Sequence, residues 1–151
     1  MSAKSRHDVL LVRAGERICA LPLAEVIEAF RPLPVRPLAG TPPFVLGMAV
    51  VRGAPAPVLC LARFLTGAPG PAPSRFVSVR CGERVAALAV EAVIGVSPLP
   101  EMDSGAPLLE QAGGGALEAA GALGSELLVL LRSVRVVPGE CWTSLDGGSA
   151  G

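Results

Sequence analysis

With 151 residues, the chain is long enough for one domain or for two small halves packed together. Its thirteen Lys and Arg balance thirteen Asp and Glu, and few aromatic residues are available to stack on bases, which argues against a nucleic-acid partner. The longest uncharged apolar run, Phe44–Val51, is far shorter than the roughly 20 residues of a membrane-spanning helix. We therefore expect a cytoplasmic protein that does not insert into a membrane.

Residues 1–8 open the chain with polar and charged side chains and are expected to form a flexible leader without an export signal. The four cysteines are widely spaced and include no C-x-x-C pair: Cys19, Cys60, Cys81 and Cys141. In a cytoplasmic protein, such cysteines are expected to be reduced, buried and free of metal.

An internal repeat is the most informative feature of the sequence. Val12–Leu21 and Val79–Leu88 are identical at seven of ten positions. Each copy holds two short β-branched runs joined at a Gly-Glu pair, which begins at Gly15 in the first copy and at Gly82 in the second. Because glycine readily adopts the positive φ of a tight turn, both copies are predicted to be β-hairpins in equivalent places. The alternative is a chance likeness between two amphipathic hairpins.

Helical spacing follows the first copy over Ala24–Phe30 and predicts a short helix, with a shorter echo at Glu91–Val93. Three prolines within Arg31–Leu38 exclude a central strand there, because proline cannot donate to a ladder. Next, Phe44–Val51 and Ala54–Leu61 are predicted to be strands joined by an Arg-Gly turn. A short helical cap is expected over Ala62–Leu65.

The second half of the chain follows a similar plan. Gly67–Pro73 is expected to link the two repeat halves, and Ser97–Gly115 is expected to form a mobile loop. Leu117–Leu123 and Glu126–Leu131 are predicted to form a further hairpin. Many short strands with little helix indicate a mostly β protein built from small barrels.

The sequence carries no recognisable catalytic or metal site. The single histidine, His7, lies in the expected leader, and Gly113–Gly115 lacks the strand and helix that flank a phosphate-binding loop. Glu25 and Glu28 could act as paired carboxylates, but a solvated helix face explains them better. We therefore predict a protein that is not an enzyme and needs no cofactor.

Two motifs stand within this order of elements: Gly47–Gly53 (Gly-Met-Ala-Val-Val-Arg-Gly) and Pro57–Leu61 (Pro-Val-Leu-Cys-Leu). With these motifs, the order of the elements resembles the CheW-like domain of bacterial chemosensory coupling proteins. The family usually shows Gly-x-x-Asn-Leu-Arg-Gly followed by Pro-Val-x-Asp-Leu. Together with the second hairpin and the late strands, the likeness runs from about Val9 to Val137.

The resemblance implies two five-stranded, SH3-like β-barrel subdomains packed around a shared core. The first would span about residues 18–75 and the second about 76–137, sharing the N-terminal strand, with a flexible tail over 138–151. It also implies an adaptor that couples the cytoplasmic tips of methyl-accepting chemoreceptors to the regulatory domain of a CheA-type histidine kinase.

The sequence departs from the family pattern at three positions: Val50 replaces the usual Asn, Cys60 replaces Asp, and Arg132 stands where an acidic residue is common. These departures leave open a divergent coupler that binds receptors or another adaptor but not the kinase. A small-ligand or RNA-binding β-barrel is a further alternative.

The partner-binding residues are expected around the Arg-Gly turn. Arg52 occupies the Arg position of the family motif, and its rigid guanidinium suits a partner's carboxylates, unless it only braces its own turn. An apolar groove near the junction of the two subdomains is expected to hold a helical receptor tip. The predicted contact residues are Phe44, Val45, Leu46, Gly47, Val50, Arg52 and Gly53.

Overall fold

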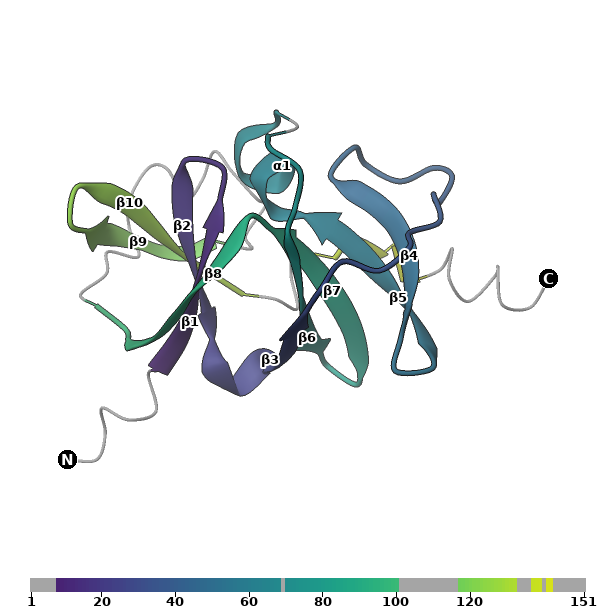
Figure 1. The fold of residues 1–151 in the computed structure, drawn as a ribbon, viewed down its shortest axis with the longest axis horizontal. Coiled ribbons are helices and arrows are strands. Elements are labelled where there is room, and N and C mark those ends of the chain that lie inside the picture. Colours follow the sequence, from purple (N-terminus) through teal and green to yellow (C-terminus); the bar gives the residue numbers. More distant parts are fainter. Residues whose placement is uncertain (1–7, 69, 101–116, 133–136, 140, 143–151) are drawn as a thin grey trace.

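The computed structural model describes residues 8–68, 70–100, 117–132, 137–139 and 141–142, and they form two five-stranded sheets (Figure 1). A 3-10 turn, η2 (Leu23–Glu25), and a helix, α1 (Leu61–Thr66), accompany the strands. The predicted mostly β fold with two five-stranded subdomains is confirmed. The strands are β1 (Asp8–Ala14), β2 (Arg17–Pro22), β3 (Val26–Phe30), β4 (Val45–Val51), β5 (Ala54–Cys60), β6 (Arg75–Cys81), β7 (Arg84–Val90), β8 (Ala92–Pro98), β9 (Leu117–Leu123) and β10 (Glu126–Leu131).

The two repeat copies form hairpins in equivalent positions, as the sequence predicted. β1 and β2 turn at Gly15, with φ of 66°, and β6 and β7 turn at Gly82, with φ of 69°. The first sheet has the order β8-β1-β2-β10-β9, and the second has the order β3-β6-β7-β5-β4. In both sheets one side of the hairpin pairs antiparallel with an edge strand, and the other side pairs parallel with an inner strand.

Each sheet combines strands from both halves of the chain, which we define as residues 8–66 and 75–131. β3, β4 and β5 complete the sheet around the second hairpin, whereas β8, β9 and β10 complete the sheet around the first. The register is symmetric: Val26 lies opposite Val79, and its repeat equivalent Val93 lies opposite Val12. The two sheets therefore do not follow the expected division between residues 75 and 76.

The short connections between strands explain this exchange. Only Glu91 separates β7 from β8, and one residue cannot close a hairpin, for which the shortest common loops have two residues. The chain therefore leaves the second sheet and β8 pairs with β1 in the first. In the first half, η2 carries the chain from β2 to β3 in the second sheet.

The helix predicted over Ala24–Phe30 is wrong. The structure has η2 followed by strand β3, which pairs with β6. Val26, Ile27 and Phe30 are β-branched or aromatic and suit a strand, and the edge of β6 satisfies their backbone groups. Phe30 also packs edge-on against Phe76, with ring centroids 6.1 Å apart. Tertiary pairing thus overrides the local helical spacing.

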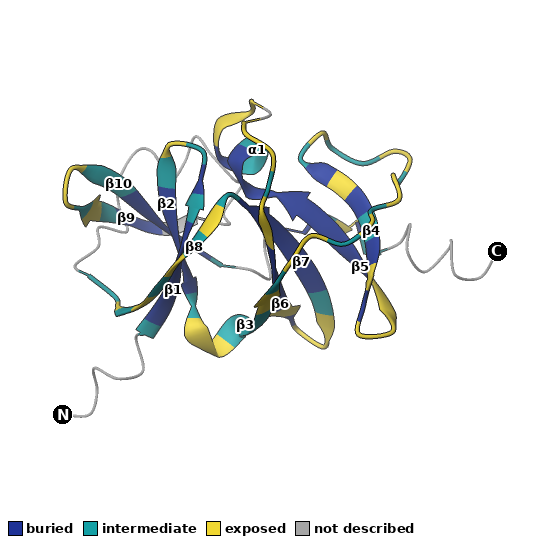
Figure 2. Cartoon of the chain, viewed as in Figure 1, coloured by how far each residue is buried: buried dark blue, intermediate teal, exposed yellow. Residues whose placement is uncertain are grey.

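One hydrophobic core joins the two sheets, as expected. It includes Val12 and Val129 from the first sheet and Leu59 and Leu88 from the second, all fully buried. Buried residues run through the strands of both sheets, while turns and outer edges are exposed (Figure 2).

The C-terminal residues differ from the expected flexible tail. Cys141 is fully buried in the shared core, and the guanidinium of Arg84 lies 5.0 Å from the centre of the Trp142 ring. Residues 143–151, like the leader residues 1–7, lie outside the described part of the chain, as does most of the loop expected over Ser97–Gly115.

Candidate protein-interaction surfaces

Strand β4 presents alternate residues to the core and to solvent. Val45 and Ala49 are buried, whereas Leu46 is 36% exposed and Val50 is 60% exposed. This alternation follows from the two-residue period of a strand, and β4 forms one edge of its sheet. Apolar side chains on the solvent side of an edge strand are unusual in proteins that act alone, and they suit contact with a partner.

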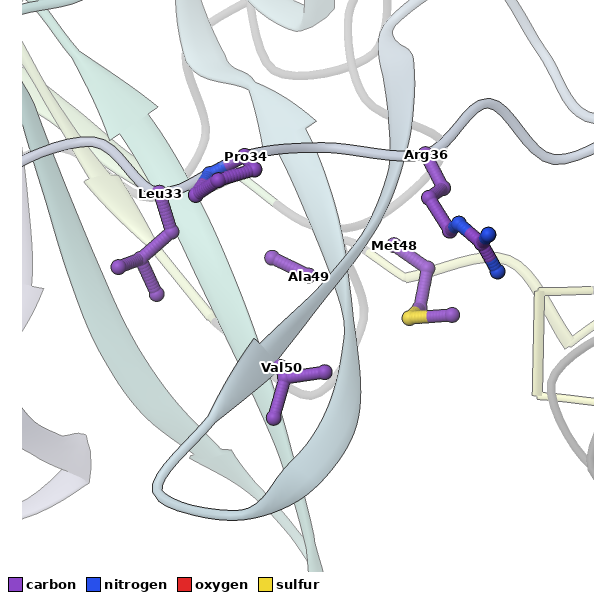
Figure 3. A pocket seen from close by; sticks show the side chains of 6 residues that line it. All are labelled: Leu33, Pro34, Arg36, Met48, Ala49 and Val50. Atoms are coloured by element: carbon purple, nitrogen blue, oxygen red, sulfur yellow. The ribbon is translucent and has the colours of Figure 1, made fainter.

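A groove of about 360 Å³ lies beside β4 (Figure 3), and we call it the β4 groove. The segment after β3 runs along this edge and is held there by two backbone hydrogen bonds: Arg36 N–H donates to Met48 O at 2.8 Å, and Met48 N–H donates to Arg36 O at 2.7 Å. Arg36 supplies the charged group among the lining side chains. The residues that line the groove are Leu33, Pro34, Arg36, Met48, Ala49 and Val50.

The position of this groove differs from the expectation. Its lining residues that the structure describes all come from β4 and the segment before it, so the groove lies on the second sheet alone. The expected site near the junction of the two subdomains would need residues of both sheets. The strand order explains the difference: β4 is the outermost strand of the second sheet and pairs with no strand of the first.

Three of the predicted contact residues face inward instead of toward a partner. Phe44 packs edge-on against Phe64 with ring centroids 5.0 Å apart, and Val45 is 8% exposed. Gly47 is required by packing: a Cβ built there would lie 2.0 Å from Arg36 O, and its φ of 144° is one that side-chain-bearing residues rarely adopt. Phe44, Val45 and Gly47 are therefore not among the residues that line the groove.

The other predicted residues, Leu46, Val50, Arg52 and Gly53, are exposed. Arg52 and Gly53 form the two-residue turn between β4 and β5, with φ values of 50° and 83°. Arg52 has the only positive φ of any non-glycine residue that the structure describes. Such backbone strain is often retained at functional sites.

Arg52 forms an ion pair with Glu28 on β3. Its Nη2 and Nε donate to the two carboxylate oxygens of Glu28 at 2.9 Å and 2.5 Å. These hydrogen bonds, together with the positive charge, hold the pKa of Glu28 below its ordinary value, and Glu28 in turn raises the pKa of Arg52. Arg52 therefore links its turn to β3, the strand at the opposite edge of the same sheet, while its side chain stays 75% exposed.

A second exposed apolar surface, missed in the sequence, lies on β8. Ile94 and Val96 are 47% and 59% exposed, and no residue of this edge strand is buried. We call these two side chains the β8 surface. Their repeat equivalents, Ile27 and Ala29, lie on β3. Interpreting the residues after each repeat copy as a strand, and not as a helix, would have predicted β8 and its outward-facing side chains.

The cysteines lie within the fold. All four are free and buried. Burial raises the pKa values of Cys19 and Cys81 to about 12, so these thiols stay protonated and unreactive near neutral pH. Among the described residues, no three His, Cys, Asp or Glu side chains gather as metal ligands would. None of the described helices is long and apolar enough to cross a bilayer.

Three comparisons relate the chain to known proteins. The family model of the CheW-like domain matches residues 8–138. The protein FrzA of Myxococcus xanthus is 33% identical over 104 residues, which span 67% of this chain and 64% of FrzA, less than two thirds of that relative. The scaffolding protein TtCheW from Thermoanaerobacter tengcongensis has a similar structure, with a TM-score of 0.70 and 21% identity over 83% of this chain and 88% of TtCheW. At this identity, the structural likeness establishes the fold.

Proposed function

This chain belongs to the CheW-like domain family of chemotaxis scaffolds and adaptors, and we propose that it couples methyl-accepting chemoreceptors to a CheA-type histidine kinase. In this role it works in the cytoplasm beside receptor arrays and catalyses no reaction. It contacts the cytoplasmic tip of the receptor and the regulatory domain of the kinase.

The presence of two separate apolar surfaces supports a coupling role. The β4 groove belongs to the second sheet and the β8 surface to the first. An adaptor that joins two partners needs two surfaces that can be occupied at once. Because the chain has no net charge, we propose that buried apolar area, more than long-range attraction, provides the affinity.

Within the β4 groove, we propose that Val50 is the central apolar contact and that Arg52 lies at the rim. Val50 stands where the family usually has Asn, so the contact here is more apolar than the family pattern implies. Arg52 offers donors at the edge of the same surface. A fork of guanidinium donors held in place by Glu28 can also reach a partner's carboxylate with little loss of side-chain entropy.

The test uses two variants that place a charge on each surface. Val50→Glu should weaken binding of one partner, and Val96→Glu should weaken binding of the other, each by at least about tenfold, because a charge cannot be buried without a pairing group. Arg80→Glu, at an exposed position on β6, is the matched control. Binding of purified receptor tip and kinase regulatory domain is measured by calorimetry, with circular dichroism as a check on folding.

If both variants still bound both partners normally, the proposed surfaces would be contradicted. Failure of the unmodified chain to bind a kinase while it binds receptors would support the divergent coupler instead. Retention of RNA or of a small molecule, with no binding of either protein, would contradict the adaptor function itself.

A further inference from the structure

The two halves of the chain are interleaved, so neither contains a complete sheet. Residues 8–66 supply β1 and β2 to the first sheet and β3, β4 and β5 to the second. Residues 75–131 supply the remaining strands of both sheets, including β6 and β7. Among the described strands, four of the eight pairings join one half to the other, and the core is shared, so each half depends on the other to complete its fold.

A single short linker joins the halves. It begins at Gly67, whose N–H donates to Arg63 O at the end of α1, and ends at Ser74, whose N–H donates to Val90 O. The linker is rich in glycine and proline, and its described residues pass beside α1 in Figure 1. Gly67 and Gly70 have positive φ, which gives the linker two positions of unusual backbone freedom.

We propose that this chain exchanges halves with a second copy, so that residues 8–66 of one copy pair with residues 75–131 of the other. Every strand pairing and core contact between the halves is preserved in the exchanged dimer, and only the linker changes its path. This is the condition under which domain exchange costs little. The partner is a second copy because it alone carries the complementary registers, Val12 opposite Val93 and Val26 opposite Val79.

Linker length sets the balance between the two forms. A short flexible linker holds the second half at an effective concentration of about millimolar, so the monomer dominates at micromolar concentration. The fraction of the protein present as exchanged dimer increases as the protein concentration rises or as the linker shortens. An exchanged dimer carries two β4 grooves and two β8 surfaces, so it can join two sets of partners. The exchange itself does not depend on the proposed function.

A complementation experiment tests the exchange in the full chain. Leu21→Asp damages the first half and Leu88→Asp damages the second, since both side chains are fully buried in the core. Each variant alone should fail to fold. When the two are refolded together, one unit combines the intact halves, so a species of dimer mass should appear with about half of the native strand signal in circular dichroism.

The matched control refolds two differently tagged Leu21→Asp copies together. Because neither copy has an intact first half, no folded dimer should form. A mixture of the two variants that recovers no folded species would overturn the proposal. If either variant folds alone, Leu59→Asp in the first half and Val79→Asp in the second, which are buried as fully, replace the pair, and a mixture of these two that recovers no folded species overturns the proposal.

A second measurement uses the linker. Deletion of Pro71–Pro73 should shift the protein from monomer to dimer in light scattering, whereas insertion of two Gly-Ser pairs at the same place should keep it monomeric. A deletion variant that remains a folded monomer at high concentration would also count against the exchange.

Discussion

Arg52 holds the carboxylate of Glu28 by two hydrogen bonds, although the two residues belong to opposite ends of one sheet. Arg52 follows β4, the last strand in the order, and Glu28 lies on β3, the first. The sheet must therefore curl until its edges face each other. Leu33 and Val50 line a pocket beside the ion pair. Side chains, and not backbone hydrogen bonds, therefore connect the two edge strands. The result is a barrel-like subdomain.

The first prediction separates binding from stability at position 52. Arg52→Asn removes the guanidinium, and Asn tolerates the positive φ of this turn better than Arg does. We expect partner binding to weaken by about tenfold or more while the melting temperature stays equal or rises. Calorimetry and thermal unfolding measure the two effects.

The matched control for this prediction is Arg75→Asn, an exposed arginine outside the turn, which should change neither quantity. If Arg52→Asn lowered the melting temperature sharply and bound normally in its folded fraction, Arg52 would be a structural residue alone.

The second prediction concerns pH. Because hydrogen bonds from Arg52 and its charge lower the pKa of Glu28 below the ordinary 4.5, the folded state favours the ionised carboxylate. The stabilisation is present above pH 4.5 and is lost as the pH falls through the lowered pKa. In Arg52→Asn, the carboxyl signal of Glu28 in an NMR titration should move to higher pH. An unchanged midpoint would show that the ion pair does not form in solution.

The third prediction concerns the two glycines of the family motif. Gly47→Ala should destabilise the fold by about 3 kcal/mol, since the new Cβ would overlap Arg36 O and the backbone would be strained. Gly53→Ala has open space around its Cβ and a φ of 83°, so only a backbone cost of about 1–2 kcal/mol is expected. Urea unfolding compares them. Equal losses would remove the argument that Arg36 lies against Gly47.

The fourth prediction concerns the cysteines. With the pKa values of Cys19 and Cys81 raised to about 12 and all four side chains buried, a thiol reagent at neutral pH should label none in the native protein. After denaturation it should label all four. Rapid labelling of the folded protein would contradict the burial, and incomplete labelling after denaturation without reductant would reveal a disulfide. Mass spectrometry counts the labels.

The sequence alone determined the elements that depend on neighbouring residues: the hairpins, their turns and the alternation along the strands. The repeat, with Gly15 and Gly82 at its turns, placed both hairpins, because a tight turn needs backbone angles that glycine provides. The same reasoning found the hairpin of Leu117–Leu123 and Glu126–Leu131, and the turn at Arg52, at the observed positions. The exposed apolar residues of β4 also followed from the sequence, since alternation along a strand is a local property.

Only the tertiary structure decided how these elements combine. Residues 26–30 form a strand because their backbone groups pair with the edge of β6, about 50 residues later in the chain. A helix would have satisfied these groups within the segment itself, so the local pattern alone could not choose between the two. The exchange of strands between halves, the pairing of Arg52 with Glu28 and the exposure of Ile94 and Val96 all depend on which strand lies beside which. Such contacts join residues far apart in sequence, and local patterns carry no information about them.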